Sequence, residues 1–170
     1  HPRKNPENLI KAFVTFREKS ASKFKLVLVG ASMWRRMKIS EEVISDKYSS
    51  DIIFTDRISS KELHLITSSA FALAYVSFYE GFGIPILEAM SCNVPVIASE
   101  TSSIPEVGGG AVLYINPYSV NSIAEAMQRM VDKPELRNDL IKKGRVQLQN
   151  FSWDRSAHIL WQSVLSTLES

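Results

Sequence analysis

The sequence predicts a doubly wound α/β fold, in which a parallel sheet is covered by helices on both faces. Short apolar runs alternate along the chain with segments of helical spacing, and strands joined by helices in this order run parallel. The runs end in Gly, Ser or charged residues, which is typical of buried strands leading into loops. With 170 residues and 45% apolar content, the chain is large enough for one domain with a substantial core.

The chain opens with a predicted helix and strand. Asn5 can cap the helix and Pro6 fits its first position, and apolar residues follow at helical spacing. Residues 24–30 (FKLVLVG) end in glycine, as a buried parallel strand does where it enters a loop. A helix capped by Ser40 is expected over residues 40–48.

The middle of the chain repeats the strand–helix unit. Ser59 stands three residues before Glu62, which is the spacing of a capping box that opens a helix to about Ser68. Gly83-Ile84-Pro85 opens a further helix that ends at about residue 91. The strands expected around these helices are residues 51–57, 71–77 and 94–99.

The last third of the chain is predicted to be mainly helical. A flexible turn at Gly108-Gly109-Gly110 leads into a short strand over 111–115, and these glycines fit neither a dinucleotide nor a P-loop spacing. The expected helices are residues 122–131, 134–148 and 152–168. Trp153 and Trp161 on the last helix are expected to be packing residues.

In such a sheet, ligands bind outside the carboxyl ends of the strands. Glu80 and Glu88 stand at this edge, with the Gly81–Ile84 turn and a helix start between them. Unpaired amides at a helix start attract anions, and carboxylates accept hydrogen bonds from hydroxyl groups. The pair therefore suits a ligand that is anionic in the middle and hydroxylated at both ends, such as a nucleoside diphosphate sugar. The residues alone leave a simpler interpretation open, in which Glu88 only favours the helix start and Glu80 ends a strand in solvent.

Several stretches together resemble one family. EGFGIPILEAMSCNVPVIAS, FTDRISSKEL, IPEVGGGAVLYINP and FSWDRSA, in this order, resemble the C-terminal domain of retaining glycosyltransferases of family 4. The resemblance covers nearly the whole chain. It implies that residues 1–170 are the nucleotide-sugar-binding half of a GT-B fold, without the N-terminal acceptor-binding domain and without the first strand of this domain.

The resemblance also implies roles for the residues around the glutamate pair. Glu88 would bind the ribose hydroxyls, and Glu80 would lie beside the donor sugar and the reacting centre. The residues whose amides would touch the sugar and the phosphates are Gly81, Phe82, Gly83 and Ile84.

A basic residue near the N-terminus would hold the diphosphate. The PRKN run supplies Lys4 for this catalytic role, with Arg3 beside it, although a solvated charge before a helix remains the alternative. Arg57 and Ile58 are candidates to receive the base, or else form a plain surface turn. Family members often carry glycine where this chain has Asp56 or Arg57, which weakens the assignment of the base contact.

The function implied is transfer of a hexosyl group, with retention, from a nucleoside diphosphate sugar to an acceptor hydroxyl in polysaccharide or glycan synthesis. The glycan or lipid-linked acceptor would bind the missing domain, and the isolated fragment would be inactive. The alternatives are a GT-B nucleotide-sugar epimerase and a non-catalytic nucleotide-sugar-binding module.

Composition excludes several other classes. The formal charge of +2 is spread without a basic block, so no nucleic-acid partner is expected. Three scattered histidines, a single Cys92 and the lack of an Asp-x-Asp pair indicate neither a metal nor another cofactor. The apolar runs are too short to cross a bilayer, so we expect a cytoplasmic protein without a transmembrane segment. The inner face of the membrane is the alternative location for the full enzyme.

Overall fold

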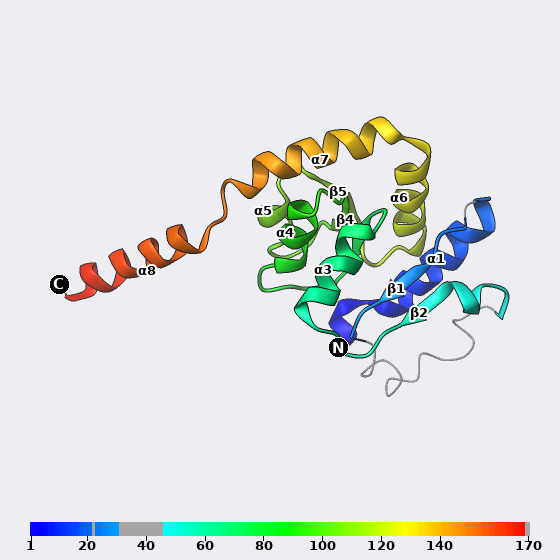
Figure 1. Cartoon of the computed structure of the whole chain (residues 1–170), viewed down its shortest axis with the longest axis horizontal. Coiled ribbons are helices and arrows are strands. Elements are labelled where there is room, and N and C mark those ends of the chain that lie inside the picture. The colour runs from blue at the N-terminus through cyan, green and yellow to red at the C-terminus, as the bar shows by residue number, and fades with distance from the viewer. Residues whose placement is uncertain (22, 31–45, 169–170) are drawn as a thin grey trace.

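The computed structural model describes residues 1–21, 23–30 and 46–168. Five strands and the helices around them form the body of the molecule (Figure 1). Residues 40–45 of the helix expected over residues 40–48 lie outside the described residues. Its last positions belong to a 3-10 helix, η3, over Asp46–Asp51.

All strand pairs of the described chain are parallel, and they form two sheets. One sheet has the order β1-β2 and the other the order β3-β4-β5. Leu26 pairs with Ile52 in the first sheet, and Val96 pairs with Leu73 and Val112 in the second. The strands are β1 (Leu26–Leu28), β2 (Ile52–Phe54), β3 (Leu73–Tyr75), β4 (Val96–Ser99) and β5 (Val112–Ile115). All five predicted strands are present, but they are shorter than expected and no ladder is described between β1 and β3.

Between β2 and β4 the strands are connected by helices, as the alternation predicted. Two short elements were not predicted, namely η1 and α5, because each is too short to show a helical period. Only the first part of η3 was predicted, as the end of the helix expected over residues 40–48. The helices are η1 (Pro2–Lys4), α1 (Pro6–Lys19), α3 (Ser60–Ser69), α4 (Ile84–Ser91), α5 (Ile104–Gly108), α6 (Val120–Asp132), α7 (Pro134–Leu148) and α8 (Trp153–Leu168).

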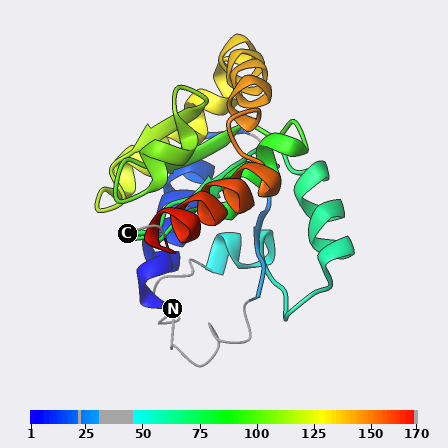
Figure 2. The ribbon, with the colours of Figure 1, turned by 90° about the vertical axis from the view of Figure 1, so that its left-hand side faces the viewer.

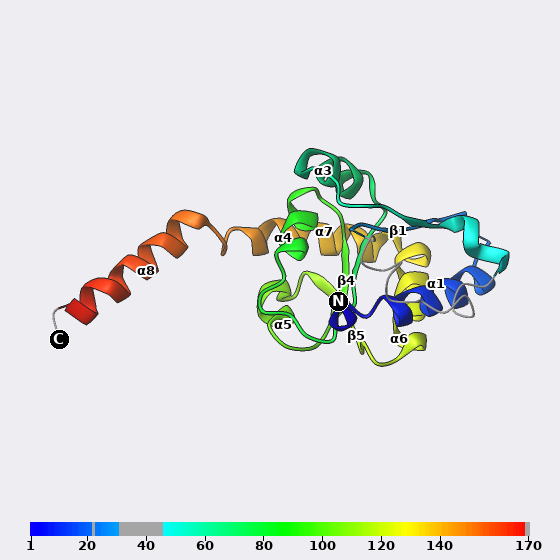
Figure 3. The same ribbon diagram turned by 90° about the horizontal axis from the view of Figure 1, so that it is seen from below.

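Both faces of the three-stranded sheet are covered. β4 is its central strand, and all four residues of β4 are buried. Ile97 packs with α1 and α6, whereas Val96 and Ala98 pack with α4 and α5. Because successive strand residues point to opposite faces, α1 and α6 lie on one face and α4 and α5 on the other (Figure 3). Leu28 of β1 and Ile52 of β2 belong to the same core as α1, so the two sheets share one core.

Of two predicted helix caps, one is confirmed and the other is wrong. The capping box of α3 is confirmed: the Ser59 hydroxyl accepts from the Glu62 amide at 3.3 Å, and the Glu62 carboxylate accepts from the Ser59 amide at 2.8 Å. The capping role of Asn5 is wrong, because its side chain makes no cap hydrogen bond. Instead, the buried amide of Asn5 donates to the carbonyls of Val76 and Pro117, at 3.0 and 2.7 Å. This amide fastens the start of α1 to the carboxyl ends of β3 and β5.

The glycine run is packed more tightly than the flexible turn that was predicted. Gly108 is the last residue of α5, and a Cβ atom there would lie 2.6 Å from the Tyr114 hydroxyl. Gly109 adopts φ 52°, a conformation that favours glycine.

The last helix, α8, projects from the body (Figure 1) and points toward the viewer in Figure 2. Trp153 and Trp161 are 84% and 59% exposed, so the prediction that they pack in the core of this chain is wrong for the described residues. Among the helices that the structure describes, none combines the length and the apolar character that a membrane span requires.

Candidate functional site

The candidate site is centred on Glu80, in the loop between β3 and α4. Glu80 is only 5% exposed, and two cations from η1 contact its carboxylate. Arg3 Nη1 lies 2.6 Å from Oε2 of Glu80, and Lys4 Nζ lies 2.6 Å from Oε1. Both carboxylate oxygens are therefore engaged by charged donors from the N-terminal end of the chain, more than seventy positions earlier.

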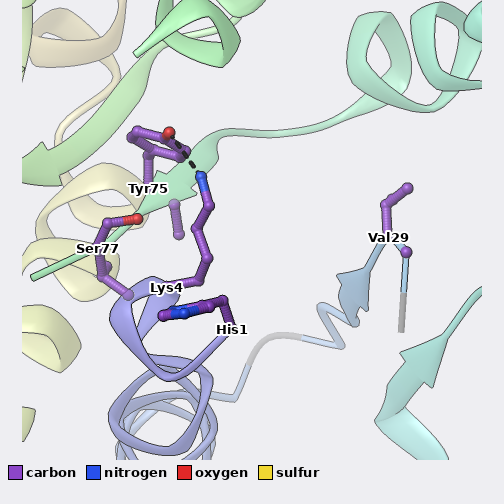
Figure 4. Close-up of a pocket in the computed structure, with 8 residues that line it drawn as sticks. His1, Lys4, Val29, Tyr75 and Ser77 are labelled. Atoms are coloured by element: carbon purple, nitrogen blue, oxygen red, sulfur yellow. Dashed lines mark hydrogen bonds between the residues drawn. The ribbon is translucent and has the colours of Figure 1, made fainter. Parts of the chain in front are cut away.

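Tyr75, at the end of β3, forms the wall behind Lys4. Lys4 Nζ donates to the Tyr75 hydroxyl at 3.1 Å and lies 5.0 Å from the centroid of the ring. Figure 4 shows Lys4 reaching from η1 toward this hydroxyl. The ammonium group thus has a carboxylate, a hydroxyl and an aromatic face around it, all of which favour a cation.

These contacts shift the pKa values of Glu80 and Tyr75. Burial raises the pKa of Glu80, but hydrogen bonds from Lys4, Ser77, Arg3 and Tyr75 outweigh burial and lower it from 4.5 to about 2. Burial, followed by the neighbouring Glu80 carboxylate, raises the pKa of Tyr75 above its ordinary value. At neutral pH the cluster contains a carboxylate, two cations and a neutral phenol.

The backbone of η1 is fastened to the same loop. The carbonyl of Arg3 accepts from the Phe78 amide at 2.8 Å, and Arg3 Nη1 also donates to the Tyr79 carbonyl at 3.0 Å. Together with the Asn5 amide, these bonds hold the two cations against the carboxyl end of β3. The position of Arg3 and Lys4 thus depends on the backbone as well as on the ion pairs.

The Gly81–Ile84 turn follows Glu80 directly. Gly83 stands before α4 with φ 114°, a conformation that other residues rarely adopt. Within the described chain, the amides of this turn donate no recorded hydrogen bond. Gly81, Phe82 and Ile84 are exposed, with Phe82 at 46% and Ile84 at 50%, whereas Gly83 is buried. The turn therefore presents several amide donors and the positive end of the α4 dipole to any ligand that binds there.

Other predicted site residues lie outside the Glu80 cluster. Glu88 is exposed on α4, and no hydrogen bond or ion pair joins its carboxylate to another described residue. Arg57 is exposed and Ile58 is half-buried in the loop between β2 and α3. The structure thus brings together Arg3, Lys4 and Glu80, and it describes no contact between this cluster and Glu88, Arg57 or Ile58.

Sequence reasoning missed several members of the site. Tyr75 and Ser77 were assigned no role in the site, although a polar residue ending an apolar run at the ligand-binding edge is a usable signal. Three hydroxyl residues at 101–103 also contact the Glu80 loop, and they follow β4 at the same edge.

A hollow of about 380 Å³ opens beside Lys4. Val29 lies across it from Tyr75 and Ser77 (Figure 4). Its lining is completed by His1, Gly30, Ala74 and Val76. The hollow therefore lies between the carboxyl ends of β1 and β3. Within residues 1–21, 23–30 and 46–168, no three His, Cys, Asp or Glu side chains lie close enough together to hold a metal ion.

Comparison with known proteins identifies relatives of the chain. It is 33% identical to O-antigen chain mannosyltransferase B from Escherichia coli over 153 residues, which is 90% of this chain and 40% of that protein. The chain thus spans less than half the length of this relative.

Solved structures share the fold. Sucrose-phosphate synthase from Thermosynechococcus elongatus matches 98% of this chain and 44% of its own, with 26% identity and a TM-score of 0.78. HepE from Anabaena, solved in complex with UDP, matches 98% of this chain and 46% of its own, with 16% identity and a TM-score of 0.80. The expected fold class, the Rossmann-like half of a GT-B fold, is confirmed.

The family model described as "Glycosyl transferases group 1" matches residues 1–147. This match includes η1, the Glu80 cluster and every strand of both sheets. The chain therefore belongs to the group 1 glycosyl transferases.

Proposed function

We propose that this chain is the donor-binding domain of a retaining hexosyltransferase of family 4, which moves a hexosyl group from a nucleoside diphosphate sugar to an acceptor hydroxyl in glycan synthesis. The observation that carries the proposal is the convergence of Arg3 and Lys4 on Glu80, next to the amides of the Gly81–Ile84 turn. The name of the Escherichia coli relative makes a mannosyl group the first donor sugar to test.

The proposed chemistry is governed by charge. As the bond to the sugar breaks, negative charge grows on the departing diphosphate. Lys4, Arg3 and the amides at the start of α4 would stabilise this charge without a metal ion, and losing one such donor typically costs about 2.7 to 4 kcal/mol of transition-state stabilisation. This role suits the two cations because η1 is already held in place before any ligand binds.

Glu80 would orient the donor sugar in this proposal and would not act as the nucleophile. Both of its oxygens are paired with cations, and its low pKa makes it a weak base. Glu88 would bind the ribose hydroxyls, since its carboxylate is exposed and has no partner among the described residues. Arg57 and Ile58 are retained as candidates for the base contact because they lie at the carboxyl end of β2.

The domain organisation is also a proposal. We infer that a further parallel strand joins the two sheets by pairing between β1 and β3. The support is that neither of these strands has a second described neighbour, that the two sheets share one core, and that the hollow beside Lys4 lies between their carboxyl ends. Such a strand followed by α1 and β1 would form a right-handed crossover. The acceptor would bind a separate N-terminal domain of the longer protein, as the 40% coverage of the relative allows.

Calorimetric titration tests the proposed function. The chain is titrated with UDP, GDP and ADP, each with and without an attached hexose, and the same titrations are made on a longer protein that contains the additional strand. We expect one base to bind in preference to the others. If no nucleotide binds to either protein, the donor-site assignment is wrong. The retaining course is tested separately, by determining the anomeric configuration of the product with NMR.

A further inference from the structure

Three consecutive hydroxyl side chains after β4 all bond to the backbone of the Glu80 loop. Thr101 donates to the carbonyl of Phe78 at 3.1 Å, and Ser102 accepts from the Glu80 amide at 3.0 Å. The Ser103 hydroxyl lies 2.9 Å from two carbonyl oxygens, those of Glu80 and Phe82. Because a hydroxyl has one proton, Ser103 shares it between these two acceptors.

Two local features indicate that this arrangement overrides the usual preferences of the backbone. Ser103 occupies the N-cap position of α5, where a serine normally accepts from an amide of the helix, yet its side chain makes no cap hydrogen bond. Ser102 adopts φ 54°, in the left-handed region that a non-glycine residue rarely occupies. Ser102 thus has a disfavoured backbone conformation and Ser103 lacks its usual cap hydrogen bond, while both contact the Glu80 loop.

The contacts of Ser103 determine where two amides of the turn point. A trans peptide unit is planar, so its N–H is directed opposite to its C=O. The carbonyl of Glu80 shares a peptide unit with the Gly81 amide, and the carbonyl of Phe82 shares one with the Gly83 amide. By holding both carbonyls, Ser103 directs both N–H groups away from itself. Neither amide has a recorded acceptor among the described residues.

The segment that carries Ser103 is held by the central strand of the sheet. It follows β4, the fully buried central strand, whose end is tied to β5 by a hydrogen bond from the Glu100 amide to the Ile115 carbonyl at 3.0 Å. The direction of the Gly81 and Gly83 amides is thus set from the centre of the sheet.

We propose that Ser103 is a positioning residue that directs the amides of Gly81 and Gly83 at an anionic oxygen of the ligand, which for the proposed function is the diphosphate of the donor. This inference rests on the proposed function for its ligand. The orientation of the amides is a separate statement that can be tested without any ligand.

The test compares Ser103→Ala with two other variants. Ser103→Thr keeps the hydroxyl and is expected to behave like the wild type. Ser119 is the N-cap of α6, and its hydroxyl accepts from the Ser122 amide at 3.2 Å. Ser119→Ala is therefore the matched control for losing a serine hydroxyl at a helix N-cap. The preferred nucleoside diphosphate from the calorimetric titration is the probe.

We expect Ser103→Ala to weaken binding of the nucleoside diphosphate about tenfold, because the two amides that donate to its anionic oxygen lose their orientation. Ser119→Ala should lower stability and leave the affinity unchanged. Labelling glycine with ¹⁵N gives a spectrum of only seven backbone amides. The Gly81 and Gly83 signals should move when the ligand binds to the wild type, and should move less in Ser103→Ala.

The outcomes separate the two proposals. If the wild type binds and Ser103→Ala matches it in affinity and in both glycine shifts, the positioning role is wrong while the donor site stands. If no protein binds a nucleotide, the proposed function fails and the diphosphate is withdrawn as the ligand. The ligand-free spectra then decide the orientation: Ser103→Ala should displace the Gly81 and Gly83 signals and Ser119→Ala should not, and unchanged signals would overturn the inference.

Discussion

Replacing Glu80 by Gln tests whether the charge of this carboxylate holds the cluster together. Each pKa unit corresponds to ~1.36 kcal/mol, and the pKa of Glu80 is lowered from 4.5 to about 2. The ionised carboxylate therefore contributes about 3 kcal/mol to the free energy of unfolding at pH 7. The Glu80 side chain is 6% exposed, but Arg3 and Lys4 are 42% and 33% exposed, so water screens the pairs in part. We expect a loss of about 2 to 3 kcal/mol in Glu80→Gln.

The same reasoning predicts how this loss depends on pH. Because the pKa is lower in the folded state, the stabilisation is complete above pH 4.5 and is lost as the pH falls toward 2. At pH 3 less than half of it should remain, about 1.4 kcal/mol before screening is considered. Urea unfolding of the wild type and Glu80→Gln at pH 7 and pH 3 measures the difference.

Glu7→Gln is the control for this experiment. Glu7 pairs with Lys11 at 2.7 Å on the exposed face of α1, and both side chains are more than 40% exposed. Removing this pair should change the free energy of unfolding by less than about 0.5 kcal/mol. If Glu80→Gln loses the same free energy at pH 3 as at pH 7, shape and hydrogen bonding account for the loss and the charge argument is refuted.

Three further predictions concern single residues. Gly108→Ala should lower the free energy of unfolding, measured by urea titration, by about 1 to 3 kcal/mol, since the new Cβ would lie 2.6 Å from the Tyr114 hydroxyl. Gly110→Ala is the control, because its Cβ would meet nothing within 4 Å, and it should stay within about 0.5 kcal/mol of the wild type. Gly81→Ala also meets nothing within 4 Å, so it should fold normally but bind the nucleotide sugar more weakly in calorimetry if the ligand approaches this backbone. Glu88→Ala should weaken nucleotide binding about tenfold whether or not a sugar is attached, and unchanged affinity would remove Glu88 from the ribose site.

The order and type of most elements could be predicted from the sequence because their signals are local. Apolar periodicity and end residues act over a few positions, so the bounds of α7 (Pro134–Leu148) were predicted to the residue and the Ser59–Glu62 capping box was confirmed. The short α5 gave no such signal, because a single helical turn shows no period. Glu80 and Lys4 were also singled out in the sequence, through the resemblance of their motifs to a known family, and the structure places them in contact. Their roles in the reaction stay predictions.

The partners of the buried polar groups were decided only by the tertiary structure. Asn5 has the local pattern of a helix cap, yet its amide is buried and bonds to Val76 and Pro117. Glu80 and Glu88 stand on either side of a glycine turn, but Glu80 is buried against Arg3 and Lys4 while Glu88 remains exposed.

The physical reason is that a buried polar group must find a partner. Which partner it finds depends on the elements that meet there, and no local pattern encodes that meeting. Glu80 meets η1 from more than seventy positions earlier in the chain, and it meets Ser103 from the next loop of the sheet. The sequence by itself therefore determined most of the elements and which residues are proposed for the site, whereas the packing of the sheet decided how those residues are held.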